Sequence, residues 1–408
     1  MGVLRIDHPD ILDFIALKET PTEMTNFNLS VGITDSFMEA LARHRTYALI
    51  NPHTSKPTRR LSAQLIFDRL VEAAWRSGEP GLVFLDTINR ANPTPRLGVI
   101  ESTNPCGEQP LLAYESCTLG SINVANFVAG PEARPTIDFV RLAETISLAV
   151  RFLDNVIDRN HLPLPQIDRM TKHTRKIGLG IMGFADLLIA LNIPYNSEAA
   201  LQMATTLMHF FQSRAHLASA ELAAERGVFP AYQGSRLQTI HQRQRNATVT
   251  TIAPTGSISL IADCSPGIEP IYGVQEVRRV MDGMMLTSLH PAFVRHARAL
   301  GLDLASLQPD LAAHPSIQHV TLMPEELRRL FVTAHDVSPE HHVRMQAVFQ
   351  RYSDSGVSKT INLPATATQA EVAAAFLLAY RLGCKGLTVF RTGSRERQVI
   401  SCSSTHPC

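Results

Sequence analysis

Residues 104–117 read NPCGEQPLLAYESC, and this stretch decides how the whole chain is interpreted. Its prolines and its glycine predict a loop, and reactive groups are often carried on loops. A cysteine that removes a hydrogen atom must hold its sulfur against a substrate carbon, and a neighbouring carboxylate can take a hydroxyl proton in the same step. Cys106 and Glu108 supply that pair. Asn104 offers a donor and an acceptor to a substrate hydroxyl, and Cys117 can supply reducing equivalents.

A plainer interpretation of this stretch is a proline-glycine turn that carries two structural thiols. Composition does not decide between the two, but it limits the class of protein. The chain has 408 residues, of which 45% are hydrophobic, and 38 Lys+Arg stand against 37 Asp+Glu, for a net charge of +1. A long duplex-binding surface is therefore not expected, and a bound nucleotide would be a small ligand.

The compartment follows from what the sequence lacks. The longest apolar run, 372–380, is too short to span a bilayer, and the first residues do not form a secretory signal. We expect a cytoplasmic protein with no membrane contact. Six cysteines in 408 residues do not form a disulfide framework, so they are expected to be buried thiols, ligands or catalysts. Cys264 and Cys384 are expected to be buried structural thiols.

Helical and strand-like patterns alternate along the chain, which favours an α/β fold. Apolar residues at steps of three or four predict a helix over 139–157, and further helices are expected over 61–75, ending at Gly78, over 198–226, ending at Gly227, and over 368–383. Thr368 and Glu371 have the spacing of a capping box. Short β-rich runs predict buried strands over 81–86, 247–253 and 386–390.

A second candidate site is the segment APTGSIS at 253–259, where a β-rich run, a turn and an expected helix start meet. Backbone amides at a helix start, together with hydroxyl groups, can bind phosphate. The predicted phosphate-binding residues are Pro254, Thr255, Gly256, Ser257, Ile258 and Ser259. On its own, a TGS turn is more often simple helix capping.

Gly178, Gly180 and Gly183 spell the GxGxxG pattern of dinucleotide-binding enzymes, which suggests an NAD-dependent dehydrogenase as an alternative. That pattern requires an apolar strand directly before the first glycine, whereas 170–176 reads MTKHTRK. We expect these glycines to permit close packing instead.

The loop sequence belongs to a longer stretch, ESTNPCGEQPLLAYESCTLGSINVANF, which strongly resembles the finger-loop region of adenosylcobalamin (vitamin B12)-dependent, class II ribonucleotide reductases. Matching segments follow in the same order from RIDHPDILDFIALK to KGLTVFRTGSR and cover nearly the whole chain. The resemblance implies an incomplete ten-stranded ribonucleotide-reductase α/β barrel over residues 1–395, with the finger loop at its centre. A flexible tail, 396–408, is expected to follow.

The resemblance also implies an activity, namely radical reduction of ribonucleoside di- or triphosphates to 2′-deoxyribonucleotides for DNA synthesis and repair. Cys106 would carry the thiyl radical, Glu108 would be the acid/base partner, Asn104 would position a hydroxyl, and Cys117 would be one of two reducing thiols. The APTGSIS segment would bind the substrate phosphates. Adenosylcobalamin would be the cofactor, and the chain lacks the DxHxxG spacing of a histidine ligand to it, as is usual in this family. No metal site is expected.

Related reductases that take their radical from another subunit need two adjacent tyrosines near the position of Val389 and Phe390. Neither residue carries a phenol group, which favours cobalamin over a class I type large subunit. A buried strand would also explain both side chains. Cys402 and Cys408 form either a thiol shuttle or an accidental pair in the tail. A metal site made of these two thiols and His406 is conceivable but poorly supported by so few ligands.

In the resembled family, the catalytic chain begins upstream of the match to Met1. That upstream part holds the second reducing cysteine and much of the site for a dNTP or ATP effector, while part of the specificity loop is expected within 18–26. We therefore expect a split or truncated reductase with an N-terminal companion polypeptide or a homodimer partner, served by a thioredoxin-like reductant. A catalytically silent nucleotide-binding fragment remains the alternative from a different class.

Overall fold

The computed structural model describes residues 1–19, 24, 26–131, 133–279, 285–313 and 316–394. Its strands are β1 (Gly2–Arg5), β2 (Leu29–Ile33), β3 (Thr46–Ile50), β4 (Pro57–Ser62), β5 (Gly81–Phe84), β6 (Ser102–Thr103), β7 (Pro110–Leu111), β8 (Thr118–Asn123), β9 (Val128–Ala129), β10 (Thr136–Ile137), β11 (Ile177–Met182), β12 (Gln275–Arg279), β13 (Met285–Leu289), β14 (Thr360–Leu363) and β15 (Gly386–Arg391).

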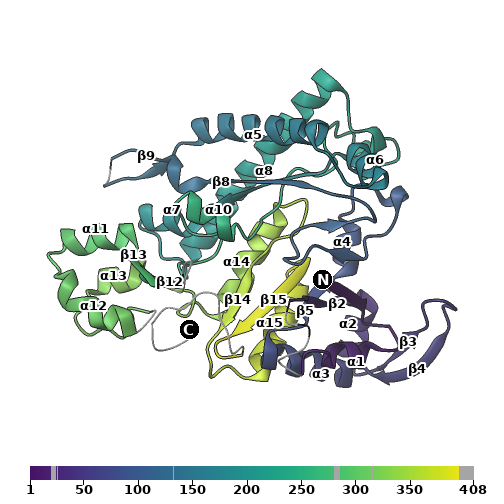
Figure 1. Cartoon of the computed structure of the whole chain (residues 1–408), viewed down its shortest axis with the longest axis horizontal. Helices are drawn as coiled ribbons and strands as arrows, with labels where there is room; N and C mark the ends of the chain where they lie inside the picture. The colour runs from purple at the N-terminus through teal and green to yellow at the C-terminus, as the bar shows by residue number, and fades with distance from the viewer. Residues whose placement is uncertain (20–23, 25, 132, 280–284, 314–315, 395–408) are drawn as a thin grey trace.

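Helices pack around the sheets, while the hairpin of β3 and β4 projects from the body of the molecule (Figure 1). The α-helices are α1 (Ile11–Ala16), α2 (Asp35–Ala42), α3 (Ala63–Ser77), α4 (Leu85–Arg90), α5 (Phe139–Arg159), α6 (Pro165–Thr174), α7 (Phe184–Ala190), α8 (Glu198–Arg226), α9 (Arg236–Thr239), α10 (Gly256–Ile261), α11 (Pro291–Ala299), α12 (Leu304–Ala313), α13 (Glu325–Leu330), α14 (Pro339–Arg351) and α15 (Gln369–Arg381). In the part of the chain that the structure describes, short 3-10 turns lie at Pro95–Leu97, Val124–Phe127 and Pro230–Tyr232.

The main sheet has the order β1-β2-β5-β15-β14. Its neighbours run parallel, except that β15 runs antiparallel to β5. Two isolated parallel bridges extend the sheet beyond β14. One joins Val357 to Ile252, and the other joins Thr250 to Leu179 in β11. β11 in turn pairs in parallel with β8. The result is a curved sheet with β1 at one edge and β8 at the other. Within the described residues, each of these two strands has a ladder partner on one side only.

The predicted strand over 247–253 is therefore present as an extended segment rather than as a regular ladder. The amide of Leu179 donates to the carbonyl of Val249, and the amide of Thr251 donates back to Leu179. On the other side of the segment, the amide of Ser358 donates to Ile252. The segment thus joins the two parts of the sheet, which is the position a barrel strand needs.

The predicted strand over 81–86 is wrong at its end. β5 stops at Phe84, and α4 begins at the next residue. Asp86 turns its carboxylate toward α2, where it accepts the amide of Asp35 at 2.6 Å, and Asn89 donates back to the carbonyl of Leu85. These contacts stabilise a helical turn in which a strand was expected.

The helix predictions are confirmed, because their signals are local, except that Leu61 and Ser62 end β4 and α3 begins at Ala63. α3 ends at Gly78, which adopts the left-handed conformation (φ +76°) that glycine accepts most readily. Ser197 caps α8, and Thr368 and Glu371 form a capping box at the start of α15. The predicted strand over 386–390 is confirmed as β15.

The two largest hydrophobic clusters among the described residues belong to different groups of elements. One core joins β8 and β11 to α5, α7, α8, α14 and the lobe of α11, α12 and α13. The other joins the main sheet to α1, α2, α3 and α15. Figure 1 shows α5 and α8 along one side of the molecule and the main sheet with α3 along the other. In the described part of the chain, no helix is long and apolar enough to cross a membrane.

Candidate active site

The Cys106 loop, defined here as residues 104–109, connects the two strands of a short antiparallel hairpin. Ser102 pairs with Leu111 and Thr103 with Pro110, so β6 and β7 hold the loop ends together. Gly107 has φ +80°, a conformation that side chains with a Cβ rarely adopt. The sequence prediction of a loop at this point is confirmed.

Asn104 closes the base of the loop from both ends. Its backbone amide donates to the carbonyl of Gln109 at 3.3 Å, and its side-chain oxygen accepts the amide of Gln109 at 3.0 Å. Its carbonyl oxygen accepts the amide of Gly107 at 3.0 Å. The asparagine therefore shapes the loop, in addition to any contact with a substrate.

The loop is fixed to the sheet through the carbonyl oxygen of Glu108. This oxygen accepts the hydroxyl of Thr251 at 2.9 Å and the amide of Gly356 at 2.8 Å. A Cβ atom at Gly356 would collide with the carbonyl of Gly107 and lie 3.0 Å from the Cα of Glu108. Glycine at this position therefore lets the sheet approach the loop backbone. Sequence reasoning missed both anchors, since each is remote from the loop along the chain.

Cys106 and Glu108 differ in exposure. Cys106 is an exposed free thiol, whereas Glu108 is 3% exposed. Burial raises the pKa of the Glu108 carboxyl, and a side-chain hydrogen bond from Asn104 opposes that rise. Although Cys106 is exposed as a residue, partial desolvation of its thiol and the neighbouring Glu108 raise the pKa of that thiol. Both effects favour a protonated thiol, which still holds the hydrogen atom that a radical step requires.

Cys117 lies directly before β8. Burial raises the pKa of its thiol, nearby Lys176 lowers it, and Glu115 and Glu108 raise it. Asn104, Cys106 and Glu108 therefore share one loop, and the charge of Glu108 contributes to the raised pKa of both the Cys106 and the Cys117 thiols.

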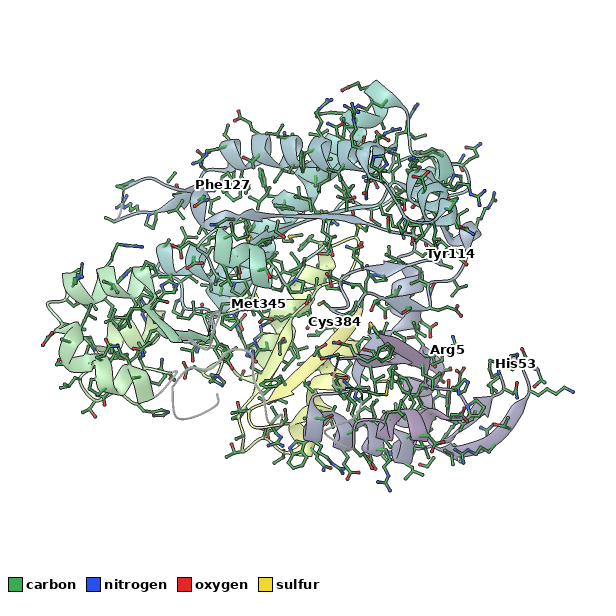
Figure 2. All side chains as sticks on the ribbon, viewed as in Figure 1. Arg5, His53, Tyr114, Phe127, Met345 and Cys384 are labelled. Atoms are coloured by element: carbon green, nitrogen blue, oxygen red, sulfur yellow. The ribbon has the colours of Figure 1, made fainter. Side chains whose placement is uncertain are left out.

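A buried ion pair lies beside Cys117. The ammonium group of Lys176 is 2.6 Å from the carboxylate of Glu115, and the side chains are 1% and 0% exposed. The same carboxylate oxygen accepts the amide of Leu112 at 2.8 Å, which fixes the strand side of the hairpin. Sequence reasoning did not select this pair, although Glu115 lies within the quoted loop stretch. The neighbouring Tyr114 is 58% exposed and projects outward (Figure 2).

The APTGSIS segment is a turn followed by the six-residue helix α10. Thr255 has φ +56°, and its hydroxyl accepts the amide of Gly267 at 2.7 Å, so it stabilises the turn internally. Ser259 is 1% exposed and its hydroxyl faces the carbonyl of Gly256. Gly256, Ser257 and Ile258 are exposed, and Pro254 is partly exposed. Of the three predicted hydroxyl ligands, only Ser257 is free to meet a ligand without rearrangement.

The three glycines of the GxGxxG pattern pack β11 against its neighbours, as the sequence analysis expected. A Cβ atom at Gly180 would collide with the carbonyl of Thr251, and one at Gly183 with the side chain of Asn123. α6 ends at Thr174 and β11 begins at Ile177, so Gly178 and Gly180 lie within the strand and no strand precedes the pattern. This arrangement lacks the strand that a dinucleotide fingerprint needs.

The remaining cysteines and the C-terminal strand agree with the predictions in part. Cys384 is fully buried in the middle of the molecule (Figure 2), but Cys264 is only half-buried, so the prediction for Cys264 is wrong. Cys264 directly follows the turn after α10, and its amide donates to Ser259. Val389 is buried in β15 and Phe390 is partly exposed. Cys402 and Cys408 lie outside the described residues, as does most of the expected specificity loop.

The chain belongs to the ribonucleotide reductase family, because its residues 1–244 and 241–390 match that family's barrel domain. This match agrees with the curved α/β sheet and with the reactive loop that the sheet holds. It confirms the family and the fold that the sequence resemblance implied.

Particular relatives resemble the chain over almost its full length. It is 49% identical over 402 residues to the vitamin B12-dependent ribonucleoside-diphosphate reductase of Thermoplasma acidophilum, with 98% of this chain and 52% of the relative covered. It is also 49% identical over 408 residues to the enzyme of the same name from Mycobacterium tuberculosis strain CDC 1551, with 100% and 58% covered. The chain spans about half the length of these curated relatives.

A solved structure supports the fold independently. The alpha subunit of the Actinobacillus ureae class Id ribonucleotide reductase superposes with a TM-score of 0.76 at 23% identity, covering 96% of this chain and 70% of the other. At this level of identity, the likeness speaks for the fold alone.

Proposed function

We propose that this chain carries the catalytic loop of an adenosylcobalamin-dependent ribonucleotide reductase, which converts ribonucleotides to 2′-deoxyribonucleotides. The observation that supports this function best is the set formed by Cys106, Glu108, Asn104 and Cys117. An exposed thiol stands beside a buried carboxyl of raised pKa, and a second thiol lies within electrostatic range of that carboxyl.

Each side chain has a separate task in this proposal. The Cys106 sulfur, as a thiyl radical, takes a hydrogen atom from a sugar carbon and returns it at the end of the reaction. Glu108 takes and returns a proton at a sugar hydroxyl, and its raised pKa brings it closer to working pH than an ordinary glutamate. Asn104 fixes the loop and orients Glu108. Loss of the 2′-hydroxyl as water needs two thiol hydrogens, one from Cys117, and leaves a disulfide.

The second thiol of that pair is proposed to come from a further polypeptide segment. Cys106, Cys117, Cys264 and Cys384 are all free thiols among the described residues. The open sides of β1 and β8 can accept additional strands, because unpaired strand edges present free backbone donors and acceptors. We propose that such strands, from a longer chain, an N-terminal companion or a homodimer partner, complete the barrel and bring this thiol. A thioredoxin-like protein would then re-reduce the pair.

The residues of the loop fit a cofactor that acts directly at Cys106. The thiol is exposed, and no hydrogen bond within the described residues engages it, so a large group can reach it. When bound, adenosylcobalamin supplies a carbon-centred radical, and the exposed face of Pro105 and Cys106 would meet it. Val389 and Phe390 offer no phenol group for a relay from another subunit. Both 49% identical relatives are named as vitamin B12-dependent reductases.

Substrate phosphates are proposed to bind at Gly256 and Ser257, the exposed start of α10. Thr255 and Ser259 support this turn from inside, and Pro254 and Ile258 flank it. The two relatives named above are called ribonucleoside-diphosphate reductases, so a diphosphate is the proposed substrate. A dNTP or ATP effector and action in the cytoplasm complete the proposal.

The test is reduction of radiolabelled CDP with adenosylcobalamin and dithiothreitol. The full chain is assayed alone and with a co-expressed segment corresponding to the upstream part of the relatives, and Cys106→Ala is the control. We expect deoxycytidine product that depends on Cys106 and increases with the added segment. A folded chain that binds the nucleotide but forms no product in any mixture would favour the silent-fragment alternative.

A further inference from the structure

The side chain of Gln109 is buried beside the Cys106 loop with both of its polar atoms unpaired. The residue is 3% exposed, and neither its amide nitrogen nor its amide oxygen has a hydrogen-bond partner within the described residues. Glu108, the preceding residue, has one buried carboxylate oxygen in the same condition. Buried polar groups in native proteins are nearly always paired, so three unpaired atoms on consecutive residues indicate a ligand or ordered water at this place.

The fold reserves space for this carboxamide. A Cβ atom at Gly178 would lie 2.8 Å from the amide nitrogen of Gln109 and 2.7 Å from the side chains of Leu119 and Thr251. The absence of a side chain at Gly178 therefore lets the carboxamide lie over β11 and β8. Thr251, whose hydroxyl anchors the loop, confines it from the other side.

The position of the carboxamide is on the Cys117 side of the loop. Gly178 pairs with Leu119 in the β8 and β11 ladder, and Leu119 is two residues after Cys117. Cys117 directly precedes β8, so Leu119 lies at the end of the strand that is next to the Cys117 thiol. Gln109 meets Leu119 over Gly178. It is thus placed toward the reducing thiol, whereas Cys106 is exposed at the loop tip.

We infer that Gln109 is a further substrate-contacting residue, which together with Glu108 binds the ribose hydroxyl that faces Cys117, the 2′-hydroxyl. This inference rests on the proposed function. A hydroxyl group donates one hydrogen bond and accepts others, so it can pair with the carboxylate oxygen and with the amide nitrogen together. A 2′-deoxyribonucleotide would leave those groups unpaired, and a site built to bond a hydroxyl rejects the analogue that lacks it.

The test measures the dissociation constants of CDP and 2′-dCDP by equilibrium dialysis with the full chain. The main variant is Gln109→Met, which keeps the length of the side chain and removes its hydrogen bonds. The matched control is Gln244→Met, since Gln244 is a 1% exposed glutamine that also has an unpaired amide nitrogen but lies beside Phe229, away from the loop. Circular dichroism checks folding, and Gln109→Glu replaces Gln109→Met if the latter does not fold.

We expect the wild-type chain and Gln244→Met to favour CDP over 2′-dCDP by about fivefold to 100-fold, the range for leaving buried partners unpaired. Gln109→Met should lower that ratio, mainly by weakening CDP binding, while the Glu108 oxygen keeps part of the preference, and Gln109→Glu should lower it because the donor is lost. A folded Gln109 variant with the wild-type ratio would overturn the inference and leave the proposed function intact. A wild-type chain that binds neither nucleotide would overturn both.

Discussion

Replacement of Lys176 by methionine should destabilise the chain more than any exposed substitution. The change leaves the Glu115 carboxylate, 0% exposed, with the amide of Leu112 as its remaining partner. Breaking a buried ion pair by removing one partner costs about 3–5 kcal/mol in the free energy of unfolding. Removing both charges costs far less, so the double variant Lys176→Met/Glu115→Gln should return to within about 1 kcal/mol of the wild type. Urea unfolding followed by far-UV circular dichroism measures each loss.

The control for this prediction is Lys172→Met. Lys172 pairs with Asp168 one turn away on α6, and the two side chains are 46% and 35% exposed. An exposed pair of this kind contributes about 0.3–0.5 kcal/mol, so the control should be almost neutral. Two results would contradict the prediction: a loss of less than about 1 kcal/mol in the unfolding free energy of Lys176→Met, or a double variant that is as unstable as the single one. Either would mean that the ion pair contributes little to stability.

Three further predictions concern packing and pH. Gly180→Ala should cost about 1–3 kcal/mol, because its Cβ collides with the carbonyl of Thr251, and an unchanged melting temperature would contradict this. Asp354 has a pKa of about 2 instead of 3.8, since His216 and two backbone amides stabilise its charge, so Asp354→Asn should cost about 2 kcal/mol near pH 6. The destabilisation by Asp354→Asn should become smaller as the pH falls from 4 toward 2. It should also become smaller as the pH rises through the raised pKa of His216. A destabilisation that does not change with pH would refute this prediction. The loss of turnover at acid pH should have its midpoint above the ordinary glutamate pKa of 4.5, and this pH dependence should disappear in Glu108→Gln. If the variant kept the same pH dependence, the titrating group would be a residue other than Glu108.

The elements that the sequence predicts well are those whose signals are local. The cap of Ser197, the left-handed Gly78 and the Thr368 and Glu371 pair all act within one helical turn. The periodic apolar face of α5 is likewise a short-range pattern. Such signals can be read without knowing what the helix packs against.

The parts that the sequence did not predict depend on contacts between distant residues. The carboxylate of Asp86 accepts the amide of Asp35, 51 positions away, and a helix replaces the end of the expected strand. The Thr251 hydroxyl anchors the Cys106 loop across 143 positions, and Lys176 pairs with Glu115 across 61. Residue types alone could place Cys106, Glu108 and Asn104 in one loop, but only the fold places Lys176 near Cys117 and the Gln109 carboxamide over Gly178.

The central claim is that the Cys106 sulfur exchanges a hydrogen atom with the bound cofactor. The most direct test is transfer of tritium from water into adenosylcobalamin in the presence of nucleotide, because this exchange needs the Cys106 thiol but no reducing pair. The full chain is measured with and without the upstream segment. Our account predicts transfer in the wild type and in Cys117→Ser, and none in Cys106→Ala. Transfer that persists in Cys106→Ala, or a wild-type chain that binds the cofactor without any transfer, would contradict it.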